Sequence, residues 1–175
     1  MQKNGDKMSL SSITLSSGLG RACAFVLLFA MPACTQLPST ASVAIPPVPA
    51  GEARVWFYRQ FNAQESTATP YIRMNDAIVA LSEPGGASYR DVPAGPYHIT
   101  VDSYGQDFNQ SKDVQLAPGQ QLYVKIVSLR QWIGGSGGGG DGSESGFGRD
   151  TFYVWLIPPE VAQGDVARSQ FYGGS

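Results

Sequence analysis

Two similar stretches decide the predicted fold: Val92-Pro93-Ala94-Gly95-Pro96-Tyr97-His98-Ile99-Thr100-Val101 and Leu116-Ala117-Pro118-Gly119-Gln120-Gln121-Leu122-Tyr123-Val124-Lys125-Ile126. Each places proline and glycine, which favour turns, directly before a run in which apolar and polar residues alternate. Such alternation is typical of a half-buried antiparallel strand, with one face covered and the other in solvent. Two strands of this kind, each entered through a turn, predict an all-β fold and a single antiparallel β-sandwich.

The sequence on both sides supplies the remaining strands. Aromatic and β-branched residues predict them at 53–59, 71–74, 77–81, 89–92, 114–116 and 151–157, and 129–133 closes the strand that follows the second turn. Asn75-Asp76 predicts a hairpin turn between the second and third of these. Pro158-Pro159 ends the last strand and suits the start of a short C-terminal helix over 160–171, followed by a frayed end at 172–175.

A glycine-rich stretch at 134–148 interrupts this pattern, and we expect it to be a mobile loop because glycine loses much backbone entropy on ordering. A phosphate-binding loop would continue with Lys and Ser or Thr into a helix, whereas acidic residues and a strand follow here. Oxygen ligands for calcium are offered by Asp141, Ser143, Glu144 and Asp150, but neither an EF-hand loop nor a repeated glycine-aspartate array is present. The prediction is therefore a flexible connection, with no metal and no cofactor.

The N-terminal region has the pattern of a bacterial secretory leader. Lys3, Lys7 and Arg21 precede the apolar run within Ala22–Cys34, which is shorter than the roughly 20 residues of a membrane-spanning helix. Met31-Pro32-Ala33-Cys34 resembles a lipobox, the motif that precedes a lipid-modified cysteine.

The lipobox resemblance implies that Cys34 becomes the lipidated N-terminus, acylated also on its amine. Thr35, in place of an aspartate after the cysteine, favours the outer membrane, with the domain facing the periplasm. The alternative is cleavage after Ser42-Val43-Ala44, which would release an unlipidated protein. The predicted organisation is a signal peptide at 1–33, a proline-rich extended tether at 34–51, a β-sandwich at 52–158 and a short helix and tail at 159–175.

Composition excludes several classes of protein. Both cysteines, Cys23 and Cys34, lie in or at the end of the leader, so the mature body has no disulfide and no thiol-based zinc site. The leader carries three basic residues and one acidic residue, so its removal changes the formal charge from −2 to −4. With no basic cluster, we expect no nucleic-acid partner.

Five segments resemble a known family: Arg54-Val55-Trp56-Phe57-Tyr58-Arg59, Tyr71-Ile72-Arg73-Met74-Asn75-Asp76, Val92-Pro93-Ala94-Gly95-Pro96-Tyr97-His98-Ile99, Ala117-Pro118-Gly119 and Tyr123-Val124-Lys125. Together they are similar to the domain-of-unknown-function family two-eight-four-six, over about 53–157. The resemblance implies a bacterial β-sandwich lipoprotein, with turns like those of small modules named for a Pro-Glu-Gly-Ala turn. The glycine-rich stretch departs from the family pattern. The family has no assigned reaction, so it implies no catalytic residue.

The residues themselves do not predict an enzyme. His98 is the one histidine, and by alternation it lies opposite Tyr97 and Ile99 on the wetter face of its strand. A catalytic triad would need a serine beside it, and the Gly-x-Ser-x-Gly elbow of hydrolases is absent from the sequence.

Aromatic residues are the remaining sign of function. The candidates for a binding face are Trp56, Tyr58, Tyr123, Trp132 and Trp155, because tryptophan and tyrosine are enriched where proteins bind partners. The alternative is that they fill the core. The sequence therefore favours a non-catalytic binding or scaffold module, lipid-anchored in the cell envelope, with a protein or glycan partner. A subunit of a secretion or envelope assembly and a hydrolase using His98 are the alternatives.

Overall fold

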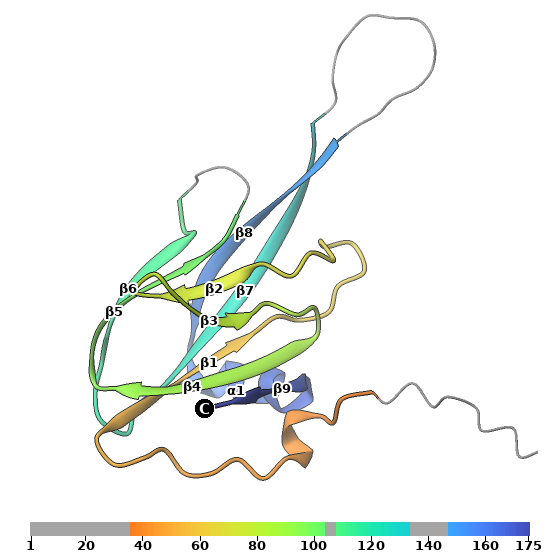
Figure 1. Ribbon diagram of the computed structural model, residues 1–175. Helices are drawn as coiled ribbons and strands as arrows, with labels where there is room; N and C mark the ends of the chain where they lie inside the picture. Colours follow the sequence, from red (N-terminus) through yellow and green to blue (C-terminus); the bar gives the residue numbers. More distant parts are fainter. Residues whose placement is uncertain (1–35, 104–107, 134–146) are drawn as a thin grey trace, which may run out of the picture. The chain divides into compact units, whose positions relative to one another are not determined.

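The computed structural model describes residues 36–103, 108–133 and 147–175, all within one compact unit that spans Thr35–Ser175 (Figure 1). Its strands form two sheets. The five-stranded sheet has the order β8-β7-β1-β4-β9, made of Phe147–Ile157, Gln121–Ile133, Glu52–Tyr58, Gly86–Pro93 and Gln170–Gly174. The four-stranded sheet has the order β3-β2-β5-β6, made of Ala77–Leu81, Tyr71–Met74, Gly95–Val101 and Ser111–Leu116. The prediction of an all-β sandwich is confirmed.

The two sheets differ in strand direction. All pairs of the four-stranded sheet are antiparallel, including the β2–β3 hairpin, whose turn residues Asn75 and Asp76 have positive φ angles of 46° and 65°. In the five-stranded sheet β1 pairs with β7, and β4 with β9, in parallel. The sandwich is therefore mainly antiparallel, as predicted, but its larger sheet contains two parallel pairs that the sequence did not indicate. An alternating pattern fixes which face of a strand is buried, but it does not fix the direction of the neighbouring strand.

The main core lies between the sheets, where the predicted faces meet. Ile99 and Val101 of β5 and Val124 and Ile126 of β7 are at most 4 % exposed, as their alternation predicts. They pack with Val55, Phe57, Ile72, Met74, Leu116, Phe152 and Val154. Burial of a side chain of this size stabilises a fold by about 1.5–3 kcal/mol.

A second apolar cluster lies on the outer face of the five-stranded sheet. The helix α1, Pro159–Arg168, contributes Ala162 and Val166, which pack against Trp56, Tyr58 and Tyr123. Pro158 precedes the helix and Pro159 occupies its first turn, as the sequence predicts, because proline suits a position whose N–H needs no helical partner. The predicted short helix is confirmed, and it ends at Arg168.

The chain after the helix is ordered. The frayed end predicted for 172–175 is wrong, because β9 runs beside β4 as far as the pair Tyr89↔Gly174, and the Asp91 N–H donates to the Ser175 carbonyl at 2.7 Å. Gly174 allows this approach, since a Cβ atom there would lie 2.0 Å from the Tyr89 ring.

The proline-rich segment is only in part the free tether that its composition predicts. Thr40 lies in a short 3-10 helix, Thr40–Ser42, and is 6 % exposed. Its N–H donates to the Ser169 carbonyl at 2.8 Å, and the Phe171 N–H donates to the Pro38 carbonyl at 2.9 Å. The tether interpretation is therefore wrong for 38–40, because these residues pair with the start of β9 and the residue before it.

The glycine-rich stretch falls largely outside the described residues, except that Phe147 and Gly148 belong to β8. Trp132 is in β7, but its side chain is outside the part that the structure describes. Within the described ranges, no helix has the length and apolar character needed to cross a membrane.

Candidate functional site

Arg54 is the first arginine of the motif Arg54-Val55-Trp56-Phe57-Tyr58-Arg59, and it is buried among groups of the fold. Arg54 in β1 is 3 % exposed, and its guanidinium forms two hydrogen bonds of 2.7 Å to the Asp91 carboxylate on β4. It also donates to the Pro46 carbonyl at 2.8 Å and stacks 4.0 Å above the centre of the Tyr89 ring. The hydrogen bonds to Asp91 raise the pKa of Arg54 above its ordinary value. These contacts leave Arg54 no open side toward a ligand, and they hold the N-terminal segment against the sheet.

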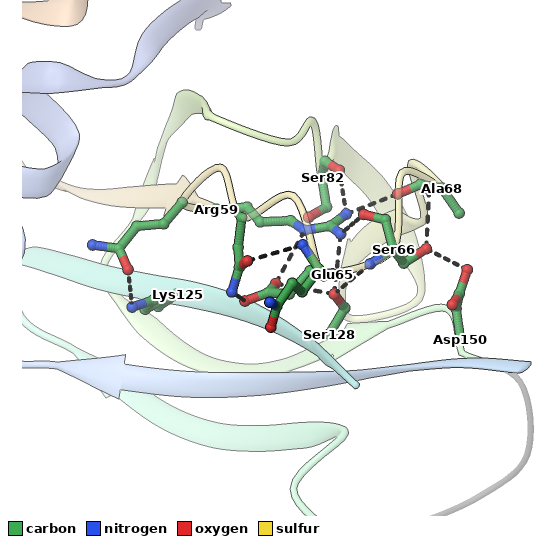
Figure 2. Close-up of polar contacts among 11 residues, drawn as sticks. Arg59, Glu65, Ser66, Ala68, Ser82, Lys125, Ser128 and Asp150 are labelled. Atoms are coloured by element: carbon green, nitrogen blue, oxygen red, sulfur yellow. Dashed lines mark hydrogen bonds and ion pairs between the residues drawn. The ribbon is translucent and has the colours of Figure 1, made fainter. Parts of the chain in front are cut away.

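The arginine at the end of the same motif is also buried. Arg59 follows β1 and is 1 % exposed (Figure 2). Its guanidinium donates to the Ala68 carbonyl at 2.8 Å, to the Ser66 carbonyl, and to the Ser128 hydroxyl on β7 at 3.1 Å. One cation therefore organises the loop between β1 and β2 and ties it to the five-stranded sheet.

Carboxylates lie near Arg59, but they do not offset the effect of burial on its pKa. Its Nε lies 4.0 Å from the Glu65 carboxylate, and the Ser66 hydroxyl donates to Asp150 on β8. Burial lowers the pKa of Arg59 below its ordinary value, while Glu65, Asp150 and Glu83 act in the opposite direction. Arginine stays charged under such conditions. Because its Nη groups donate to two loop carbonyls and to the Ser128 hydroxyl, Arg59 is a structural residue of the loop.

His98 lies where its alternation predicts, on the exposed face of β5. Its side chain is 46 % exposed, and its Nδ1 lies 2.6 Å from the Asp113 carboxylate on the neighbouring β6. Its backbone N–H donates to the Asn75 side chain at 2.8 Å. Within the part of the chain that the structure describes, no hydroxyl group is hydrogen-bonded to the imidazole. The described residues also contain no group of three His, Cys, Asp or Glu side chains placed to hold a metal ion.

Three of the five predicted binding aromatics are in the wrong place for a docking face. Trp56, Tyr58 and Tyr123 are 2–5 % exposed, because α1 covers the sheet above them. The alternative, that they fill the core, is the observed arrangement. Trp155 on β8 is 51 % exposed. It pairs with Lys125 of β7, which pairs in turn with Tyr58 of β1, so Trp155 shares the sheet face of the other three but is not buried with them.

The four outer strands of the sandwich are protected to different degrees. On β8, the Phe152 and Val154 N–H groups donate to Ser103 and Asn109, at 2.9 and 2.8 Å. The start of β9 is paired with 38–40. The outer strand β6 carries charge at Lys112 and Asp113, a common defence of a strand edge.

The remaining outer strand, β3, has no charged residue. Its sequence is Ala77-Ile78-Val79-Ala80-Leu81, and Ile78 and Leu81 are 51 % and 45 % exposed. An uncharged apolar strand edge is a template for pairing with another chain. Two features protect this edge from further pairing. The pairing of β3 with β2 contains a bulge, and the Arg90 Nε–H donates to the Val79 carbonyl at 2.6 Å.

A groove of about 400 Å³ runs between β3 of one sheet and β4 and β9 of the other. Exposed apolar side chains of Tyr71, Ile78, Leu81 and Tyr172 line it. Arg90 contributes a guanidinium that bonds to Val79 on β3 and to Ser175 after β9, so it links the two sides. Sequence reasoning missed this groove, because its walls come from 71–81, 83–90 and 172–174. The signal available in the sequence was the uncharged strand 77–81.

Comparison with known proteins adds little to this description. No protein-family model matches the chain, and no curated protein matches it. Among solved structures, the N-terminal domain of AlgF from P. aeruginosa is similar at 20 % sequence identity and a TM-score of 0.34, over 63 % of this chain and 98 % of that domain. A TM-score this low supports no conclusion about the fold or function of the present chain. The class of protein is therefore defined by the fold itself, an all-β sandwich with one short helix in its described part.

Proposed function

We propose that this protein is a lipid-anchored module of the bacterial envelope that binds an extended segment of a protein partner, without catalysis, at the edge of β3. The observation that carries the binding function is the uncharged, exposed strand Ala77–Leu81 on one wall of an apolar groove. The lipobox-like residues 31–34 support an envelope lipoprotein, and the exposed Trp155 is a secondary contact candidate.

An extended peptide suits this site better than a compact ligand does. A peptide that adds a strand to a sheet edge gains main-chain hydrogen bonds, and pockets beside the edge select alternate side chains. Here the groove places Tyr71 and Tyr172 beside that edge, so apolar side chains of the added strand can pack against them. The one cation, Arg90, already donates to Val79 and Ser175, so the site favours apolar contacts over recognition of an anionic glycan.

The structure also supports the position of the anchor. Cleavage after Ser42-Val43-Ala44 would remove the buried Thr40 and the segment that pairs with β9. Burial and three long-range hydrogen bonds would be lost, so we infer that processing occurs upstream, before Cys34. The proposed location is the outer membrane, facing the periplasm, with Thr35 after the cysteine.

The anchor is tested by the intact mass of membrane-extracted protein beside a Cys34→Ala variant. We expect a mature species that starts at Cys34 and carries lipid, and we expect it to be absent from the variant. An unlipidated species starting at Ile45 would overturn the anchor.

The binding site is tested by a photo-crosslinking residue placed at Ile78 of the full-length protein in cells. The expected product is a crosslink to one extended segment of an envelope protein, mapped by mass spectrometry. It should be lost when Leu81→Lys is added, because a charge then lies in the groove. It should persist with Val161→Lys, a matched change at a 58 % exposed residue on α1.

The outcomes separate the alternatives. Crosslinks to polysaccharide would identify a glycan partner and would overturn the proposed binding of an extended protein segment. Crosslinks that Leu81→Lys does not affect would show that the edge of β3 is not the site. Recovery of a fixed stoichiometric complex through β3 would identify the partner as a subunit of an envelope assembly.

A further inference from the structure

The place where the N-terminal segment joins the domain limits how far the domain can lie from its anchor. Pro38 and Thr40 are bonded to Phe171 and Ser169, so the chain is held from Pro38 onward. Only four residue steps separate Cys34 from Pro38. An extended chain covers at most about 3.5 Å per residue, so this connection reaches about 14 Å. The free tether predicted for 34–51 would have reached about 50 Å.

A 14 Å connection is no longer than the radius of gyration of the domain, which is about 14 Å for a chain of this length. A lipid chain at Cys34 lies in the bilayer, so the surface around Pro38 has to lie at the membrane. The geometry thus sets one side of the domain against the headgroups, whereas a longer tether would have left its orientation free.

The surface around Pro38 carries exposed apolar side chains. Leu37 is 42 % exposed, and Phe61, in the loop after β1, is 71 % exposed. Phe61 shares a hollow of about 300 Å³ with Ser169 and Gln170, the residues that bond to or pair with 39–40. Apolar and aromatic side chains that meet a bilayer surface favour the boundary between headgroups and acyl chains.

We propose that the domain lies on the membrane with the surface that contains Leu37 and Phe61 against the lipid. This inference rests on the proposed anchor at Cys34. It makes Phe61 a membrane contact, and it places the β9 end of the β3 groove beside the bilayer. A partner segment that enters the groove would then come from a chain at the same membrane surface.

The protein offers a matched control for this proposal. Phe108 is also a strongly exposed phenylalanine, at 89 %. It comes three residues before β6, an outer strand of the four-stranded sheet, whereas the segment around Thr40 pairs with β9 of the five-stranded sheet. The mature body has no cysteine besides Cys34, so Phe61→Cys and Phe108→Cys each create a single free thiol in a lipidated chain.

Each variant is expressed with its leader, extracted, labelled with a fluorophore and reconstituted in vesicles of phosphatidylethanolamine and phosphatidylglycerol that contain a brominated lipid. We expect severalfold stronger quenching at position 61 than at position 108. Leu37→Cys is the second test position and should be quenched like position 61.

The intact mass of each labelled sample separates the two proposals. A lipidated sample with equal quenching at positions 61 and 108, or with stronger quenching at 108, overturns the orientation and leaves the anchor standing. A sample without lipid overturns the anchor, and with it the orientation.

Discussion

Replacement of Arg59 by methionine tests the reasoning about the buried network most directly. Arg59→Met keeps an unbranched side chain but removes every donor. It leaves the carbonyl of the buried Ser66, and that of Ala68, without the guanidinium that now binds them (Figure 2). A buried acceptor that loses its donor costs about 1–3 kcal/mol, and breaking a buried charge network costs about 3–5 kcal/mol. We expect the free energy of unfolding to fall by about 3–5 kcal/mol, a large part of the 5–15 kcal/mol typical of a domain.

The assay is urea unfolding of the full mature protein in detergent, followed by tryptophan fluorescence. The matched control is Arg73→Met, because the Arg73 guanidinium makes hydrogen bonds too, two of them to the Asp102 carboxylate, but its side chain is 32 % exposed. Water can replace those bonds, so the control should lose much less stability. A loss below about 1 kcal/mol for Arg59→Met, or a loss equal to that of the control, would refute the structural role assigned to Arg59.

Three further changes test other parts of the structure. Burial raises the pKa of Tyr58 to about 12 from its ordinary 10.0, so stability should fall as pH rises through this range, and Tyr58→Phe should remove that dependence in unfolding titrations. Gly174→Ala should destabilise the protein by about 1–3 kcal/mol in the same unfolding assay, because its Cβ would meet the ring of Tyr89. His98→Ala should cost less than about 1 kcal/mol, because the pair with Asp113 is at the surface, and a larger loss would contradict that reading.

Several features followed from short-range patterns in the chain. Asn75-Asp76 predicted the β2–β3 hairpin because these residues tolerate the positive φ angles that a two-residue turn requires. Alternation placed Ile99 and Val124 in the core and His98 outside it, since side chains of a strand point to opposite faces in turn. Pro158-Pro159 predicted the start of α1 for an equally local reason.

The candidate site was not predictable in the same way. The groove needs β3, β4 and β9 side by side, and nothing within any one of them specifies the other two. The aromatic prediction failed at Trp56 for the same reason, because its burial depends on a helix that begins about a hundred residues later in the chain. The proline-rich segment looked like a free tether because its partner, the edge of β9, lies at the opposite end of the sequence.

The sequence alone therefore determined the strands other than β9, the buried faces of β5 and β7, the hairpin and the helix, because each depends on the period and the turn residues of a short segment. The tertiary structure decided the parallel pairs of the five-stranded sheet, the burial of the motif arginines, the open edge of β3 and the fixed position of Pro38. Those features depend on which distant segments pack together. The arrangement that forms is the one in which core burial and strand pairing together give the lowest free energy for the whole domain.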